Sequence, residues 1–429
     1  MSMPWYGALP KRWEAHKTSE LFSERCEKVS DTDFAPLSVS KGGIVPQIAT
    51  VAKSNAGDNR KLVRKGDFAI NSRSDRRGSS GVSQYDGSVS LINIVLKPRS
   101  ETNGNYWHYL LKSHSFIEEY YRNGRGIVAD LWTTRLSEMK TIYLPLPPRD
   151  EQDQIVRYLD WKVSQINKLI NTKRRQIALL GEQKRALVNE AVTQGGEGWE
   201  DISLGNLGSF RKGFGGSRAD DSADGVACIR YGDIYRTGAL LLKQPITRIN
   251  QQSAEGYARV NKNEMLFALS GETKEEIGQS LINNIDEDTW CSGDAAIFTA
   301  NTRILPQFLV FALRCPDVVR QRASLAKGDI IVHISTSALR RLRISAPPIA
   351  EQQEIATYLS NQCERIDKVI EDLNQEITLF TEYRTRLISD VVTGKLNVRS
   401  VIVPEYEAVE DVAEETVGED EEVVGVDDE

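Results

Sequence analysis

Two stretches of the chain, residues 150–194 and 350–393, place apolar residues at the a and d positions of a heptad repeat. A sustained repeat of 3.5 residues predicts a long helix whose apolar seam packs against another helix. Lys173, Lys184 and Arg384 interrupt the seam. Because the two stretches are the obvious partners of each other, we expect them to form an antiparallel coiled coil. The seam residues that carry this expectation are Leu159, Ile166, Ile170, Ile177, Leu359, Ile366, Ile370 and Ile377.

The two helical stretches are copies of each other. A shift of 200 residues aligns residues 147–194 with residues 347–394 without a gap, and sixteen of the 48 aligned positions are identical. A proline pair precedes each helix, which suits a first turn that needs no N–H donors, and Gly195 or Gly394 follows its end. The chain is therefore internally duplicated, and we expect a pseudo-two-fold symmetry within one polypeptide.

Each helical stretch follows a segment of about 145 residues that reads as short strands between Gly-rich turns, with a helical stretch near its end. These late helical stretches are Tyr106–Tyr121 and Pro306–Leu325. We therefore predict an α+β protein with two mixed, β-rich globular domains that are separated by the two long helices. The expected divisions are globular domains at 1–146 and 196–346, helical regions at 147–195 and 347–399, and a tail at 400–429.

The acidic residues are concentrated at the C-terminus. The whole chain carries 54 Lys and Arg against 61 Asp and Glu, but residues 401–429 hold 13 of the acidic residues and no Lys or Arg. Residues 1–400 therefore carry 54 basic against 48 acidic residues, a net charge of +6. We expect the tail to be a disordered, solvated appendage. The mildly basic body permits a nucleic-acid partner.

Composition and motifs exclude several classes of protein. The five cysteines and four histidines are scattered without metal-ligand spacing. No apolar run approaches the roughly 18 residues of a membrane span, and the first residues lack a signal-peptide core, so we expect a cytoplasmic protein. We find no phosphate-binding loop, catalytic triad or methyltransferase signature. We therefore expect a non-catalytic protein without a cofactor or metal of its own, with an enzyme whose site has no local motif as the remaining alternative.

Basic residues gather in Gly- and Ser-rich loops of both globular segments. Arginine can bond both acceptors of a guanine edge, glutamine can read adenine, and glycines let the backbone approach phosphates. For a single loop of this kind, a solvated surface loop is the favoured explanation. One in each copy of a duplicated segment favours a paired DNA reader. The candidate DNA-binding residues are Lys41, Arg73, Arg76, Arg77, Gln84, Tyr85, Arg211, Lys212, Arg218, Arg230, Tyr231 and Lys327.

The start of each long helix repeats the same polar pair followed by an isoleucine. Pairing of the helices alone does not require this pattern in both copies. A shared site for docking a protein partner explains it, and so does common ancestry after duplication. The candidate docking residues are Glu151, Gln152, Ile155, Glu351, Gln352 and Ile355.

The sequence resembles the specificity subunits of type I restriction-modification systems over nearly all of residues 1–399. The resemblance is most specific at the two helix starts, Pro147 to Ile155 and Pro347 to Ile355, and at the Val-Thr helix ends. The segments LSVSKGGIVPQ (37–47), VRKGDFAINSRS (63–74) and YDGSVS (85–90) resemble one class of target-recognition domain, and IRYGDIY (229–235) resembles another. The acidic tail departs from the family pattern.

The resemblance implies how the parts work. Each globular domain would be a target-recognition domain that reads one half of a bipartite double-stranded DNA site through the major groove. The helices would set the spacing and dock two adenine methyltransferase subunits, which in turn recruit restriction endonuclease and translocase subunits. S-adenosylmethionine, ATP and magnesium would then belong to those partners. A DNA-binding adaptor of the same fold in another phage-defence assembly is the alternative.

Overall fold

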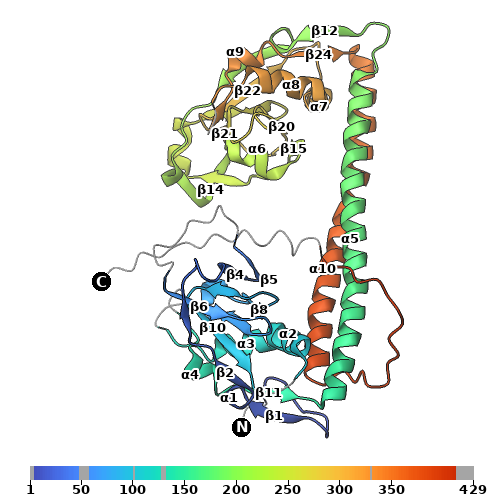
Figure 1. The fold of residues 1–429 in the computed structure, drawn as a ribbon. Coiled ribbons are helices and arrows are strands. Elements are labelled where there is room, and N and C mark those ends of the chain that lie inside the picture. Colours follow the sequence, from blue (N-terminus) through green and yellow to red (C-terminus); the bar gives the residue numbers. More distant parts are fainter. Residues whose placement is uncertain (1–3, 48–57, 100–101, 127–131, 329–330, 412–429) are drawn as a thin grey trace. The chain divides into compact units, whose positions relative to one another are not determined.

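The computed structural model describes residues 4–47, 58–99, 102–126, 132–328 and 331–411. The chain forms two compact units: unit 1 combines residues 1–176 with 372–429, and unit 2 contains residues 177–371. Two long helices, α5 (Arg149–Thr193) and α10 (Ile349–Val392), each contribute to both units (Figure 1). The predicted α+β class, with two mixed globular domains and two long helices, is confirmed.

The globular domain of unit 1 is built from short strands and two stacked helices. A four-stranded sheet has the order β2-β10-β7-β8, a three-stranded sheet has the order β3-β6-β9, and β4 pairs with β5. The pairings within these sheets are antiparallel. The strands are β1 (Glu14–Lys17), β2 (Phe22–Glu24), β3 (Lys28–Val29), β4 (Leu37–Ser40), β5 (Gly43–Pro46), β6 (Arg60–Val63), β7 (Phe68–Asn71), β8 (Ser80–Val82), β9 (Gly87–Val89), β10 (Asn93–Pro98) and β11 (Tyr143–Leu146). The helices are α1 (Thr18–Leu21), the 3-10 helix η1 (Ser74–Arg76), α2 (Gly104–Lys112), α3 (His114–Arg122) and α4 (Leu136–Met139).

The globular domain of unit 2 has larger sheets. A five-stranded sheet has the order β13-β22-β18-β20-β15 and a four-stranded sheet has the order β16-β14-β21-β17. The strands are β12 (Glu200–Ser203), β13 (Gly208–Lys212), β14 (Asp221–Ile229), β15 (Leu241–Leu242), β16 (Thr247–Ile249), β17 (Ala258–Val260), β18 (Met265–Ala268), β19 (Ser270–Gly271), β20 (Ser280–Asn283), β21 (Thr289–Cys291), β22 (Ala295–Ala300), β23 (Val332–His333) and β24 (Arg343–Ala346). The helices are η3 (Leu204–Asn206), η4 (Arg218–Asp220), α6 (Tyr231–Thr237), η5 (Gln251–Gly256), α7 (Pro306–Ala312), α8 (Pro316–Leu325) and α9 (Thr336–Leu339).

The two domains share the elements that lead into the long helices. In unit 1, β1 pairs antiparallel with β11, and α5 starts three residues after β11; in unit 2, β12 pairs with β24 in the same way before α10. Each predicted late helical stretch is a pair of helices. Ser113 separates α2 from α3 because its hydroxyl caps α3 by accepting from the Phe116 N–H. Pro316 begins α8 at a position where a proline is tolerated.

The long helices run antiparallel, and the interruptions of the heptad seam explain the register. In unit 1, Lys173 pairs with Glu376, and the Arg384 guanidinium donates to the Asn167 amide oxygen at 2.6 Å. In unit 2, the Lys184 ammonium lies 2.6 Å from the Asp367 carboxylate. Residue numbers therefore rise along α5 as they fall along α10, and each interrupting cation meets an acceptor on the facing helix.

The seam residues are buried to different degrees. Leu159, Ile166, Ile170 and Leu359 are buried in the cores of their units, whereas Ile177, Ile366, Ile370 and Ile377 are partly exposed. The buried residues belong to the same packed clusters as residues of the globular domains. The two helices differ at their middles, because Ile170 of α5 is fully buried whereas its counterpart Ile370 of α10 is partly exposed.

The C-terminal segment corrects one expectation. The sequence predicted disorder from residue 400, but residues 401–411 lie along α5 in unit 1. Main-chain carbonyls of Val398, Val401, Glu407, Val409 and Glu410 accept hydrogen bonds of 2.7–3.0 Å from side chains of α5. The donors are Gln154, Ser164, Asn167 and Asn171. These contacts use the main chain of the segment, so its acidic side chains do not prevent it from packing. Residues 412–429 of the predicted tail lie outside the described residues.

Candidate nucleic-acid interface

The first predicted basic loop surrounds η1, between β7 and β8, and is held against α3. Arg77 forms an ion pair with Glu118, and its guanidinium lies over the Tyr121 ring, 5.5 Å from the centroid. The Tyr121 hydroxyl lies 3.2–3.3 Å from the carbonyl oxygens of three loop residues, Asn71, Arg73 and Arg76. Burial raises the pKa of Tyr121 to about 12, so the hydroxyl remains a donor at neutral pH. The loop therefore has a fixed shape with its arginines at the surface.

The arginines of this loop already have acidic neighbours. The Arg73 Nε lies 3.4 Å from Asp75, and side chains of Arg73 and Arg77 are 41% and 49% exposed. Exposed ion pairs of this kind are weak in water. A phosphate could therefore replace the carboxylate of either pair at little cost.

The other predicted residues of unit 1 lie in two further turns. Lys41 is exposed in the turn between β4 and β5, where its carbonyl accepts from the Lys112 ammonium at 3.0 Å. Gln84 and Tyr85 are exposed in the turn between β8 and β9. Ser83 shapes that turn because its hydroxyl donates to the Tyr85 carbonyl at 2.7 Å. The structure thus places the η1 loop before β8, and Gln84 and Tyr85 after it.

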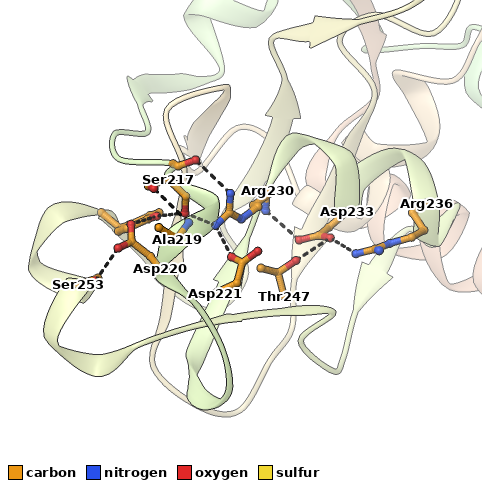
Figure 2. A network of polar contacts seen from close by, with 11 residues as sticks. Ser217, Ala219, Asp220, Asp221, Arg230, Asp233, Arg236, Thr247 and Ser253 are labelled. Carbon is orange, nitrogen blue, oxygen red and sulfur yellow. Dashed lines mark hydrogen bonds and ion pairs between the residues drawn. The ribbon is translucent and has the colours of Figure 1, made fainter. Parts of the chain in front are cut away.

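The second predicted loop, residues 211–218 of unit 2, is organised at its C-terminal end by Arg230 (Figure 2). The Arg230 guanidinium donates to the carbonyl oxygens of Gly216 at 3.1 Å and Ser217 at 2.8 Å, and pairs with Asp221. Gly215 has a φ of +78°, and a Cβ there would lie 2.3 Å from the Gly256 carbonyl oxygen, so only glycine fits. The loop is preorganised by its own contacts.

A buried carboxylate anchors Arg230 in turn. Asp233, which is 2% exposed, accepts from the Arg230 main-chain N–H at 2.9 Å, from Arg236 at 2.6 Å and from the Thr247 hydroxyl at 3.0 Å (Figure 2). The Arg230 side chain is only 16% exposed. Its contacts therefore support a positioning task within the loop, which the sequence did not reveal.

The Arg211 side chain is also bound to another residue of its own domain. Its guanidinium pairs with both oxygens of Glu264 at 2.6 Å. Burial raises the pKa of Glu264, but hydrogen bonds from Arg211, the Thr299 hydroxyl and the Asn261 N–H outweigh it and hold that pKa below the ordinary value. A charge-assisted bidentate pair is among the stronger polar contacts in proteins. Arg211 is therefore a weaker candidate for DNA contact than its neighbour Lys212.

The remaining predicted DNA-binding residues of unit 2 are accessible. Lys212 and Arg218 are exposed, and neither has an ion pair among the described residues. Tyr231 is 39% exposed at the start of α6, and Lys327 is exposed beside a main-chain bridge to His333. The sequence prediction overlooked Phe214, which is 52% exposed between Lys212 and Arg218. An aromatic residue inside a basic glycine-rich loop was the signal, since such rings can stack on bases.

The repeated polar pair at the helix starts has an intramolecular task, and this corrects its assignment to partner docking. Glu151 and Gln152 are 4% and 3% exposed, Gln352 is 1% exposed and Ile155 is 2% exposed. Side chains so deeply buried cannot form a docking surface. Glu351 and Ile355 are only partly buried and stay candidates for a partner contact.

Each glutamine joins its long helix to the neighbouring helix pair. The Gln152 Oε1 accepts from the Asn103 N–H at 3.0 Å, just before α2, and Gln352 accepts from the Leu305 N–H at 2.8 Å, just before α7. Their amide groups also donate to the carbonyls of Pro147 and Pro347. Glu151 and Glu351 accept from the indole N–H of Trp13 and Trp199. The same docking of helix on domain occurs in both copies.

Other kinds of site have no support in the described part of the chain. Its histidines, cysteines and carboxylates form no group of three that could hold a metal ion. None of its helices is long and apolar enough to cross a membrane.

Comparison with known proteins was made by family model, sequence and fold. The model described as "Type I restriction modification DNA specificity domain" matches residues 10–179 and again residues 196–379. A putative type I restriction enzyme MjaX specificity subunit from Methanocaldococcus jannaschii is 21% identical, over 92% of this chain and 96% of that protein. The MjaVIII specificity subunit from the same organism is 24% identical over 61% of this chain and 64% of its own length.

Two solved structures share the fold. A chain from a study of complex assembly and conformational transition of the type I R-M system superposes with a TM-score of 0.71 at 15% identity, covering 91% of this chain and all of that one. The HsdS subunit from Thermoanaerobacter tengcongensis gives a TM-score of 0.50 at 16% identity, with 92% of this chain and all of that chain covered.

Proposed function

Because the chain belongs to the family of type I restriction-modification DNA specificity proteins, whose specificity subunits are non-catalytic DNA-recognition subunits, we propose that it reads a bipartite DNA sequence and docks the methyltransferase subunits of such a complex. Each β-rich domain reads one half of the site. The endonuclease subunits join through the methyltransferases, and the catalytic cofactors belong to those partners.

One observation carries the proposal: two related domains, each joined to a copy of the same helix, present exposed cations on shaped loops. In unit 1 these are the arginines around η1, together with Lys41 and the Gln84–Tyr85 turn. In unit 2, Lys212, Phe214 and Arg218 lie on or beside the loop that Arg230 holds. A rigid loop loses little conformational entropy on binding, which favours readout of base edges.

The roles of the predicted residues divide accordingly. Lys212, Arg218 and Lys327 are suited to phosphate contacts, because they are exposed. Tyr231, Tyr85 and Gln84 are exposed and can reach base edges or stack. Arg230 and Arg211 position the loop and strand that carry these groups.

Selection from a randomised DNA library with the purified full chain and its methyltransferase subunit tests the proposal. We expect a split motif, two specified blocks separated by an unspecified spacer. Exchanging residues 196–346 for the matching segment of a relative should change one block and leave the other intact. A single continuous motif, or a change in both blocks, would contradict the proposal of one half-site for each domain.

The alternative of an adaptor in another defence assembly has a different outcome. It also predicts a split motif but no association with an adenine methyltransferase. Light scattering of the chain mixed with a type I adenine methyltransferase subunit would separate the two.

A further inference from the structure

Each globular domain contains a row of three side chains on neighbouring extended segments. In unit 1, Thr133 pairs antiparallel with Arg125 on one side and with Arg73 on the other. Directly opposite residues of an antiparallel pair place their side chains on the same face. Arg125, Thr133 and Arg73 therefore lie side by side, and we call them the unit 1 row.

Unit 2 repeats this arrangement. His333, which stands 200 residues after Thr133, pairs antiparallel with Lys327 on one side and with Ser270 on the other. The main-chain bonds agree, because Arg125 and Thr133 exchange two bonds of 2.9 Å, and Lys327 and His333 exchange bonds of 2.9 and 2.7 Å. We call Lys327, His333 and Ser270 the unit 2 row. The two rows are therefore copies of one feature.

One predicted DNA-binding residue lies in each row, at opposite ends. Arg73 of unit 1 corresponds to Ser270, whereas Lys327 of unit 2 corresponds to Arg125. The duplication thus brings two separate predictions to one place on the domain. It also adds Arg125, whose side chain is 84% exposed, and the exposed His333, which the sequence prediction did not include.

The two rows share a cation at one end. Arg125 is highly exposed although its Nε lies 3.5 Å from Glu138, and Lys327 is exposed as well. An arginine and a lysine are interchangeable where charge alone matters, as in a simple phosphate contact, but not where a bidentate geometry is needed. Because phosphates are the same in every DNA sequence, the shared cation is suited to the DNA backbone.

The other two positions of the rows differ, and each row has one large polar side chain beside a small one. In unit 1 Arg73 lies beside Thr133, and in unit 2 the His333 Nδ1 lies 3.0 Å from the hydroxyl of Ser270, which is 8% exposed. This contact holds the imidazole and leaves its Nε2 for another partner. Arginine can bond both acceptors of a guanine, and an imidazole nitrogen can donate to or accept from a base edge. The differing positions are therefore suited to reading bases.

We propose that the two rows are equivalent DNA contacts, in which Arg125 and Lys327 bind phosphates while Arg73 and His333 each read one base. Arg73 reads a guanine in the half-site of unit 1, and Ser270 positions His333 for the half-site of unit 2. This inference rests on the proposed function, in which each domain reads one half-site. It adds the residues by which equivalent places in the two domains distinguish different bases.

The phosphate contacts are tested with the full chain and a type I adenine methyltransferase subunit, by fluorescence anisotropy on the duplex that selection returns. R125A and K327A should each weaken binding to every sequence several-fold and lower the salt slope by about one unit. K327R keeps the charge and should bind like the unchanged chain. The matched controls are R149A and R303A, which remove exposed, ion-paired arginines at the start of α5 and just before α7, and they should leave the slope unchanged.

The base contacts are tested by repeating the DNA selection. R73A should lose the preference for guanine at one position of one block, and H333A should lose the preference at one position of the other block, by about tenfold or more in each case. S270A should weaken the preference at the same position as H333A, because the imidazole loses its support. A purely structural role of Ser270 would not single out that position. Thermal unfolding would verify that the variants fold.

The outcomes separate the inference from the proposed function. If the unchanged chain selects a split motif and both R125A and K327A keep its affinity and salt slope, the rows are not phosphate contacts, and the inference is overturned while the proposed function stands. Unchanged base preferences in R73A and H333A would overturn the reading roles in the same way. An unchanged chain that selects no split motif would overturn both the proposed function and this inference.

Discussion

The indole N–H of Trp13 donates a hydrogen bond of 2.6 Å to the carboxylate of Glu151, and this contact fastens the first strand of unit 1 to the start of α5. The counterpart in unit 2 runs from Trp199 to Glu351 at 3.1 Å. Trp13-Glu14 and Trp199-Glu200 stand at the start of the two globular segments. In both copies the tryptophan and the first residue of the repeated polar pair are therefore two ends of one contact. The duplication preserved the contact as a unit.

Replacing Trp13 with phenylalanine should lower the free energy of unfolding by about 1.5–3 kcal/mol, because a buried carboxylate loses a donor. Arg12 and Arg399, at 3.2 Å and 2.8 Å from Glu151, would still keep it paired. The same change at Trp199 is the matched comparison, and its cost should be smaller because Glu351 is partly exposed. Urea unfolding of both variants measures the difference; a larger loss for W199F would contradict the argument.

Ile170→Asp tests the seam of the helix pair. Ile170 is fully buried in the core of unit 1, so an aspartate there would lack water and a partner and should cost several kcal/mol. Leu169→Asp is the control, since Leu169 is 47% exposed on the neighbouring helix face. Circular dichroism during thermal unfolding should show a large drop in midpoint for I170D only. The midpoint of thermal unfolding of Ile370→Asp should lie between those of I170D and L169D, because Ile370 is partly exposed.

The structure shows why the sequence predicted the long helices but not their contacts. A period of seven over more than 40 residues is local information, and it was enough for α5 and α10. The contacts of the polar pair within the chain could not be predicted, because their donors, such as the Asn103 N–H and the Trp13 indole, lie far away in the sequence. The strands and loops were placed only coarsely, because their pairing depends on partners that no local pattern specifies.

The prediction of disorder for the C-terminal segment was wrong at residues 401–411 for a different reason. Composition describes its side chains, yet four polar side chains of α5 bind its main chain, and Asp411 is buried between Arg174 and Arg384. Arg384 was already conspicuous as a break in the heptad seam. Its carboxylate partner could not be foreseen, because acidic residues fill the tail and only the fold selects one of them.

Asp411→Asn should loosen this segment by removing the charge between the two arginines. The readout is hydrogen exchange at the Val409 N–H, which donates to the Ser164 hydroxyl at 2.8 Å and should exchange at least several-fold faster. Glu410→Gln is the control, because Glu410 is exposed and its carbonyl, which accepts from Asn171, is unchanged by the substitution. Equal exchange rates in D411N and the unchanged chain would show that the hydrogen bonds to α5 suffice without the ion pairs.

Arg211 and Lys212 are neighbours on β13 with different expected roles. Arg211→Ala leaves Glu264 buried without its main partner and should cost about 1–3 kcal/mol of stability at neutral pH. Since the pKa of Glu264 is lowered in the folded protein, the pair stabilises above the ordinary glutamate value of about 4.3, and that stabilisation disappears as the pH falls below it. The stability difference between R211A and the unchanged chain should therefore shrink on acidification.

Lys212→Ala should leave stability unchanged but weaken DNA binding. If Lys212 contacts phosphate, the slope of log affinity against log salt should fall by about one unit and all sequences should be affected alike. Fluorescence anisotropy with a labelled duplex between low and moderate salt measures both effects. If K212A bound DNA with unchanged affinity while R211A folded normally and bound DNA more weakly, the DNA contact would belong to Arg211 and not to Lys212.

The last prediction concerns the helices as the determinant of spacer length. Because Lys184 pairs with Asp367 and Lys173 with Glu376, a heptad inserted in α5 alone would shift one of these contacts out of register. Inserting seven residues between Lys173 and Lys184 and seven between Asp367 and Glu376 keeps both. Seven residues add about 10 Å of helix, and B-DNA rises about 3.4 Å per base pair, so the spacer between the half-sites should lengthen by at most about three base pairs. DNA selection with this double insertion should return the same two half-sites at the new spacing, whereas insertion in α5 alone should lower stability. Half-sites that change while the spacer stays constant would show that the helix pair does not determine the spacing.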